Sequence, residues 1–414
     1  MQWSSRAMLR LLIVNILDRE EKIMDEQITT LASLTIDGKG SYGIGASAVP
    51  FSKDLYTYLR ITDIKDDGTL NLQDLKSVED EKASEYLLKP NDIVFARTGA
   101  STGRNYFYDG TDGEFVYAGF LIKFSIDEKK INPKYIKYFC QSKQYKDWIN
   151  SFNTGSTRGN INAQTLGKMP IPLIERKKQD ALVCILSSID EKIKKNNEIN
   201  NNLEQQAQAL YKDWFFDFSP FSTEGNLPDG WHLGTVGDII QLHDSKRVPL
   251  SGSERDKMEK IYPYYGATSL MDYVENYLFD GIYLLLGEDG TVVNGLGFPI
   301  LQYVYGQFWV NNHAHIITGK EGFSVEELYL FFSLTNIKSI VTGAVQQKVS
   351  QQNLKKVPAI IPSKEALSAF DDLIQPIFAQ IRNLRDENAH LADLRDTLLP
   401  RLMSGELDVS DTEI

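Results

Sequence analysis

Two long stretches of the chain repeat apolar residues at alternating steps of three and four positions. They begin near Gln179 and near Ala366. This spacing predicts two amphipathic helices that pack as a coiled coil about 50 Å long. Asn200 and Asn388 fall at equivalent positions of the two seams. We expect these asparagines to face each other in an antiparallel pair and to fix its register, since a buried Asn needs a polar partner. Two unrelated surface helices are the alternative.

Before each helical stretch, short apolar runs are typical of strands. Residues 92–97 and 282–286 predict one strand in each half, and a Gly-rich turn follows each of them. Residues 115–126 and 308–318 predict a second strand. A helix start follows in both halves, with Asn132 and Pro133 as N-cap and first residue in one, and a capping box from Ser324 to Glu327 in the other.

The two halves match each other residue by residue. Thr154-Gly155 corresponds to Thr342-Gly343, and Pro170 corresponds to Pro358, all at one offset without a gap. The sequence therefore predicts an internal duplication with a mixed α/β (α+β) fold: two pseudo-repeated globular domains and two long antiparallel coiled-coil helices. The expected segments are an extension that is poorly ordered or precedes a working start at Met24 (1–24), domain 1 (25–175), helix 1 (176–218), domain 2 (219–364), and helix 2 with a tail (365–414).

Charge is distributed unevenly along the chain. The formal net charge of −12 argues against a protein that coats nucleic acid nonspecifically. Basic residues nevertheless outnumber acidic ones between 129 and 178, and 336–364 contains lysines without any acid. Cys140 and Cys184 lie in apolar helical patterns, so we expect two small core residues and no disulfide. The sequence has no apolar run long enough for a membrane span.

The segment 154–162 reads Thr-Gly-Ser-Thr-Arg-Gly-Asn-Ile-Asn. Small hydroxyl residues and glycines let the backbone approach an anion, and the arginine offers paired donors. The segment therefore suits phosphates or base edges, although a solvated connecting loop is the alternative reading. Its second copy at 342–350 places glutamines and a lysine there. The candidate DNA-binding residues are Arg97, Thr102, Arg104, Thr154, Ser156, Thr157, Arg158, Asn160, Asn162, Lys168, Lys246, Arg247, Gln346, Gln347, Lys348 and Lys356.

Catalytic and metal-binding motifs are missing from the sequence. The glycine-rich stretch 287–297 does not end in Gly-Lys-Ser/Thr and is no P-loop. His313 and His315 are neighbours on one strand face without a third ligand in the sequence pattern, which favours packing or DNA-facing residues over a metal site. We expect the aromatic residues 214–216 to pack the end of helix 1 onto a domain or a partner. Recognition is therefore favoured over catalysis.

The Thr-Gly-Ser-Thr loop, the following Leu-Gly-Lys-Met-Pro-Ile-Pro at 166–172, the heptad helix and the degenerate second copy resemble the specificity subunit of type I restriction–modification systems. The resemblance covers the chain from about Ile28 to Val409. It departs at the helix entry, where Glu175-Arg176-Lys177-Lys178-Gln179 replaces the adjacent Glu-Gln usual in the family, and the first 23 residues are unmatched.

The resemblance implies two target-recognition domains that each read half of a bipartite DNA site. It also implies antiparallel helices that hold these domains apart and dock two methyltransferase subunits. Methylation and cleavage would belong to these and to restriction/translocase subunits, which use S-adenosylmethionine, ATP and magnesium. The chain itself would bind double-stranded DNA in the cytoplasm, without a cofactor or metal. A two-domain adaptor that binds only proteins, and a stand-alone restriction or methyltransferase enzyme, are the competing hypotheses.

Overall fold

The computed structural model describes residues 27–72, 74–152, 160–221, 226–343, 346–407 and 409. The chain forms two compact units. Unit 1 comprises Met1–Lys194 and Asn388–Ile414, and unit 2 comprises Lys195–Glu387. Each unit therefore joins a globular domain to a segment of both long helices, so the compact units differ from consecutive stretches of sequence. The extension 1–24 lies outside the described residues.

Unit 1 contains two four-stranded sheets and a two-stranded ribbon. The central sheet has the order β2-β9-β6-β7, with β2 at Ser41–Tyr42, β9 at Leu121–Ser125, β6 at Asp92–Ala96 and β7 at Asn105–Tyr108. The second sheet, β3-β5-β4-β8, is formed by Ala48–Pro50, Lys76–Val78, Tyr56–Leu59 and Phe115–Tyr117. In the ribbon, β1 (Gln27–Thr30) pairs antiparallel with β10 (Pro170–Leu173).

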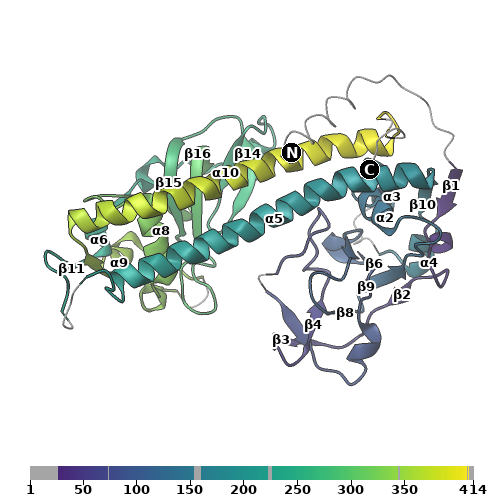
Figure 1. Ribbon diagram of the computed structural model, residues 1–414, viewed down its shortest axis with the longest axis horizontal. Coiled ribbons are helices and arrows are strands. Elements are labelled where there is room, and N and C mark those ends of the chain that lie inside the picture. Colours follow the sequence, from purple (N-terminus) through teal and green to yellow (C-terminus); the bar gives the residue numbers. More distant parts are fainter. Residues whose placement is uncertain are drawn as a thin grey trace, which may run out of the picture. The chain divides into compact units, whose positions relative to one another are not determined.

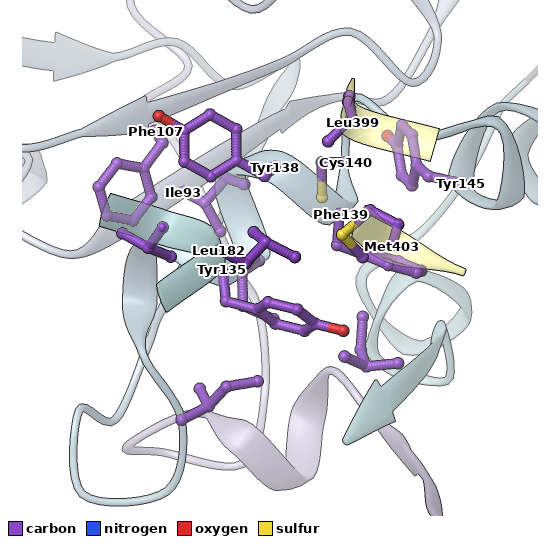
Figure 2. Packing of buried hydrophobic residues seen from close by; sticks show 14 of the residues in the cluster. Ile93, Phe107, Tyr135, Tyr138, Phe139, Cys140, Tyr145, Leu182, Leu399 and Met403 are labelled. Atoms are coloured by element: carbon purple, nitrogen blue, oxygen red, sulfur yellow. The ribbon is translucent and has the colours of Figure 1, made fainter. Parts of the chain in front are cut away.

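The core of unit 1 forms where helices cover the central sheet. Helix α2 (Pro133–Phe139) starts with Asn132, whose side chain accepts a hydrogen bond from Lys134, as the sequence predicted. Helices α3 (Lys143–Asn150) and α4 (Ala163–Gly167) follow. Tyr135, Tyr138 and Phe139 from α2 pack with Leu182 and Met403 from the two long helices (Figure 2). Burial of these large apolar side chains stabilises the unit by removing hydrocarbon surface from water.

Unit 2 contains one six-stranded sheet, β12-β17-β15-β16-β13-β14, and a ribbon of β11 with β18. The sheet strands are β12 (Ile240–Leu242), β17 (Ala314–Gly319), β15 (Phe279–Gly287), β16 (Leu301–Val310), β13 (Tyr262–Tyr265) and β14 (Leu270–Val274). The ribbon pairs His232–Thr235 with Pro358–Ile361. The order β12-β17-β15-β16 repeats the order β2-β9-β6-β7 of unit 1, as an internal duplication requires.

The helices of unit 2 are α6 (Val236–Ile239), α7 (Gly252–Arg255), α8 (Val325–Leu334) and α9 (Gln351–Leu354). Helix α8 begins with the predicted capping box of Ser324 and Glu327. Of the aromatic residues that end the first long helix, Trp214 and Phe215 pack onto this core as predicted, whereas Phe216 is exposed. Phe215 is buried, with its ring centroid 4.8 Å from that of Phe370 and 5.5 Å from that of Trp231.

The two long helices are α5 (Arg176–Phe215) and α10 (Lys364–Met403), each of 40 residues (Figure 1). Within unit 2 they run antiparallel, since Asn196 donates to Glu387 at 3.0 Å while Tyr211, further along α5, contacts Phe370 near the start of α10. Within unit 1, Asp190 of α5 pairs with Arg395 of α10 at 3.3 Å. The mixed α/β class and the pairing of two long helices are confirmed. Among the described residues, no helix is long and apolar enough to cross a membrane.

Two expectations about local structure were wrong. The single strands predicted at 115–126 and 308–318 are each interrupted by a turn, which separates β8 from β9 and β16 from β17. At the first turn, a side chain on Gly119 would come within 3.2 Å of the Ile44 carbonyl oxygen, so the chain bends where it passes close to another backbone segment. The second error concerns Cys184, which is exposed on α5, whereas Cys140 is buried as expected.

Candidate nucleic-acid interface

Arg97 follows the last residue of β6, and its backbone is held on both sides. Its N–H donates to the Phe120 carbonyl at 3.1 Å, and its carbonyl accepts from the N–H of Ile161 at 2.9 Å. The next residue, Thr98, forms an isolated β-bridge with Asn160. The strand end, the turn before β9 and the chain that follows the predicted binding loop therefore meet at Arg97.

Two aromatic rings flank the Arg97 side chain. Its guanidinium carbon lies 5.2 Å from the ring centroid of Tyr42 and 5.9 Å from that of Phe120. The Tyr42 hydroxyl accepts from the N–H of Ala163 at 3.1 Å, so this ring is anchored to the start of α4. Both rings are largely exposed, with 44% of Tyr42 and 56% of Phe120 accessible. A half-buried cation beside two such rings is restrained in its orientation.

The neighbouring candidates Thr102 and Arg104 have intramolecular partners. The Thr102 hydroxyl donates to the Gly99 carbonyl at 2.8 Å. The Arg104 guanidinium makes two hydrogen bonds to Asp66, at 2.7 and 3.1 Å, and a third to the Ile64 carbonyl at 3.2 Å. Such a bidentate pair fixes the side chain, so Arg104 ties the loop before β5 to the central sheet.

The rest of the first predicted loop divides into three groups. Thr154, Ser156, Thr157 and Arg158 lie outside the described residues. The Asn162 side chain caps α4 by accepting from the Thr165 N–H at 2.8 Å. Asn160 and Lys168 are exposed and stand on the same stretch of chain as this cap. The short helix α4, with its cap at Asn162, thus leads from Asn160 to the ribbon strand β10.

Glu288 occupies in unit 2 the position that Arg97 has in unit 1. Its N–H donates to the His313 carbonyl at 2.8 Å, and its carbonyl accepts from the Val349 N–H at 2.8 Å. The following residue, Asp289, is bridged to Lys348 as Thr98 is bridged to Asn160. The backbone arrangement is therefore repeated, while the side chain has the opposite charge.

The Glu288 carboxylate belongs to a buried ionic network. Arg247 donates to it at 2.6 Å and lies 3.6 Å from Asp244, while Lys348 lies 3.3 Å from Glu288. Burial opposes ionisation of both carboxyls, but hydrogen bonds and nearby positive charges outweigh it, so the pKa values of Asp244 and Glu288 are lowered. The fully buried His315 contacts Asp244 at 2.6 Å and the Val349 carbonyl at 2.8 Å.

Asp244, Glu288 and His315 also form a set of groups of the kind that ligate metals, with their ligand atoms within 4.8 Å of one another. The Arg247 guanidinium, however, already donates to Glu288 and to the carbonyls of Asn312 and Ala314. A divalent cation would have to displace this guanidinium, so the network supplies its own positive charge. His313 instead lies 2.6 Å from Asp289 and is half-exposed.

Of the candidates in unit 2, Arg247 has the most intramolecular partners and only 13% of its side chain is exposed. Lys246, Gln346, Gln347 and Lys356 are exposed, and Lys348 exposes 52% of its side chain beside Glu288. On the helices, Asn200 is buried and belongs to unit 2, while Asn388 belongs to unit 1. The pairing of these two asparagines stays a prediction.

Sequence reasoning missed Tyr42, Phe120, Asp244 and Glu288. The gap-free match of the two copies begins only near Thr154. Upstream of it, a constant offset therefore does not show which residues at the strand ends correspond. One signal was available, because Phe120 directly follows a glycine inside an otherwise apolar run. Phe120 is exposed at this turn.

The profile of the type I restriction modification DNA specificity domain matches residues 52–205 and again 228–389. The chain belongs to the type I restriction–modification DNA specificity family. The two matches coincide with the two copies of the duplication. The chain therefore has the role of a DNA-recognition subunit, a non-catalytic component of such a system, and the protein-only adaptor is not favoured.

Individual relatives agree with this membership. The chain is 24% identical to the type I restriction enzyme MjaIX specificity subunit of Methanocaldococcus jannaschii, over 69% of this chain and 72% of the relative. It is 21% identical to the HindI specificity subunit of Haemophilus influenzae, over 77% of this chain and 87% of the relative. The crystal structure of a type I S subunit from M. genitalium shares the fold, with a TM-score of 0.52, 18% identity, and coverage of 93% and 97% of the two chains.

Proposed function

We propose that each globular domain of this specificity subunit reads one half of a bipartite, asymmetric DNA site. The observation that carries the proposal is the repeated backbone arrangement with opposite side chains, Arg97 in one domain and Glu288 in the other. Two domains with the same backbone arrangement would approach DNA in the same way, whereas different side chains would select different bases. The two half-sites therefore differ in sequence.

The exposed basic and amide residues of both domains supply the contacts. In domain 1 these are Asn160 and Lys168, together with the half-buried Arg97 and the predicted binding residue Arg158. In domain 2 they are Lys246, Gln346, Gln347, Lys348 and Lys356. We exclude Arg104 and Arg247 from direct contact, since binding DNA would require their ion pairs with Asp66 and Glu288 to break.

The two long helices set the distance between the half-sites and dock the partner subunits. Two methyltransferase subunits bind the chain, and restriction/translocase subunits join this complex. These partners carry the S-adenosylmethionine, ATP and magnesium, and the assembly acts on DNA in the cytoplasm. Helices of 40 residues are about 60 Å long, which corresponds to roughly 18 base pairs of duplex. Insertion of four residues into α5 near Asn200 should change the half-site spacing or prevent assembly, and unchanged spacing with full activity would refute this role.

Salt-dependent DNA binding tests the function as a whole. The full chain, reconstituted with its methyltransferase partner, is titrated with duplex carrying the methylated motif of the host genome and with scrambled duplex at several salt concentrations. Tight, motif-specific binding with a steep log–log slope is expected, because phosphate contacts release counterions. Arg158→Ala should lower that slope by about one if Arg158 meets a phosphate. Salt-independent binding, or equal affinity for the scrambled duplex, would overturn the proposal.

A further inference from the structure

We propose that Arg97 reads a guanine in the half-site of domain 1, with Tyr42 and Phe120 as positioning residues that hold its guanidinium. This inference rests on the proposed function and adds the base, the atom contacts and the residues that restrain them. The corresponding position in domain 2 does not read a base in this way.

The Arg97 guanidinium is isolated from acceptors within the described part of the chain. Among the described residues, the Arg97 Nε atom is buried and has no hydrogen-bond partner. A buried donor without an acceptor costs free energy, on the order of 1–3 kcal/mol. Arg104 and Arg247, by contrast, are each paired with a carboxylate. The buried Nε is out of reach of an outside ligand, so the terminal nitrogens of the Arg97 guanidinium are the donors that a base edge would use.

The movement of the Arg97 side chain is also restricted. Both backbone polar groups of Arg97 are hydrogen-bonded, so the base of the side chain is fixed. The guanidinium lies near the rings of Tyr42 and Phe120, and Tyr42 is itself anchored by the Ala163 N–H. A restrained planar fork loses little further conformational freedom when it forms two parallel hydrogen bonds.

The surroundings of Arg97 favour a base edge over a phosphate as its partner. Guanine presents the acceptors O6 and N7 side by side in the major groove, and a planar guanidinium donates to both. The guanidinium is flanked by exposed aromatic surface of Tyr42 and Phe120, which suits contact with bases better than with a charged, hydrated phosphate. Exposed lysines such as Lys168 suit phosphates, since they are flexible point charges.

The corresponding residue of domain 2, Glu288, has different surroundings. Glu288 exposes only 15% of its side chain, and its charge is balanced by Arg247 and Lys348. It accepts hydrogen bonds within the protein and offers none to guanine. Guanine recognition at this structural position is therefore confined to domain 1.

The test uses the reconstituted complex of the full chain and duplexes with the methylated motif. Each guanine of the motif is replaced in turn by 7-deazaguanine, which keeps base pairing but lacks the N7 acceptor. With the wild-type chain, one such replacement should weaken binding about 10-fold, within the range known for bidentate pairs. Arg97→Ala should bind the natural and the modified duplex equally, and Phe120→Ala should reduce the discrimination without abolishing it.

Lys168→Ala is the matched control in the same domain. It should weaken binding to all duplexes equally and leave the discrimination at the sensitive guanine intact. Thermal melts of all variants show that domain 1 remains folded. If no guanine is sensitive, or if Arg97→Ala changes only the salt slope, the guanine contact is overturned while the proposed function stands. If the wild-type complex does not prefer the motif at all, the proposed function itself fails.

Discussion

Arg97 and Glu288 stand at the same place in two copies of one fold, yet their surroundings differ completely. Arg97 lies beside two exposed aromatic rings and has no acceptor for its Nε among the described residues. Glu288 contacts His315 and lies in a network in which Arg247 and Lys348 balance the charge of its carboxylate. The first arrangement leaves charge available to a ligand, and the second uses charge to stabilise the domain.

The backbone arrangement is repeated in the two domains, whereas the side chains on it differ. The frame consists of backbone hydrogen bonds, such as those from Ile161 to Arg97 and from Val349 to Glu288, and these are repeated. The side chains on this backbone differ between the copies, and in the proposed function these side chains read the bases. Substitutions should therefore separate stability from DNA binding, in opposite ways in the two domains.

The largest effect is expected for Asp244→Ala in domain 2. Removing Asp244 takes away the 2.6 Å partner of the buried His315 and the acceptor of the Ile316 N–H, which should lower the free energy of unfolding of unit 2 by about 3–5 kcal/mol. Hydrogen exchange of β15 and β17 amides measures this loss. The control is Asp66→Ala in domain 1, which removes an exposed partner of Arg104 and should cost less than about 1 kcal/mol. Equal losses would show that the buried network has no special role.

Glu327 is a buried carboxyl of unit 2 that behaves differently from Asp244 and Glu288, whose pKa values are lowered. Burial raises its pKa from the ordinary 4.5 to about 8, and the nearby Asp371 and Glu326 add to this. Since the folded state holds the proton more tightly than the unfolded state, stability should fall as pH rises from 4.5 to about 8, by a few kcal/mol, and stay constant above that. In Glu327→Gln, urea unfolding should lose most of this slope, whereas an unchanged slope would locate the titration elsewhere.

Arg97→Ala should have a much smaller effect on stability than Asp244→Ala. Contacts between a partly exposed cation and aromatic rings contribute on the order of 1 kcal/mol, and no ion pair is lost among the described residues. Urea unfolding of the variant measures this change. A loss as large as that of Asp244→Ala would mean that Arg97 supports the fold rather than a ligand.

The smallest effect is expected for Lys168→Ala and Lys356→Ala, two exposed lysines at corresponding positions after α4 and α9. If the frame is shared, each lysine meets one phosphate, and each substitution lowers the log–log salt slope of DNA binding by about 0.9. Titrations at several salt concentrations measure the slope. A change for one lysine only would limit the shared frame to one domain.

The elements that depend on local pattern could be predicted from the sequence. Apolar spacing located α5 and α10 within a few residues, and the caps at Asn132 and Ser324 marked the starts of α2 and α8. The interruption between β8 and β9 could not be predicted, because it depends on the approach of Gly119 to a distant carbonyl group.

The candidate site was predictable only in part, for a similar reason. Sequence composition identifies basic residues, but the distinction between Arg97 and Arg247 depends on which carboxylates the fold brings near them. Glu288 is far from Arg247 in sequence, and their 2.6 Å contact arises from the pairing of strands in the six-stranded sheet and the loops at its edge. Recognition of the family supplied the role of the chain, while the structure supplied the contrast between its two domains.

The most direct test of the central claim is sequencing of methylated bases in host DNA, with the wild-type gene and with Arg97→Ala in its place. The account predicts an asymmetric bipartite motif in the wild type. In the variant, one base position in one half of the motif should lose its restriction to guanine, and the other half should stay unchanged. Relaxation of both halves, or an unchanged motif with full methylation, would contradict the claim that the two domains read separately through unlike side chains on a common frame.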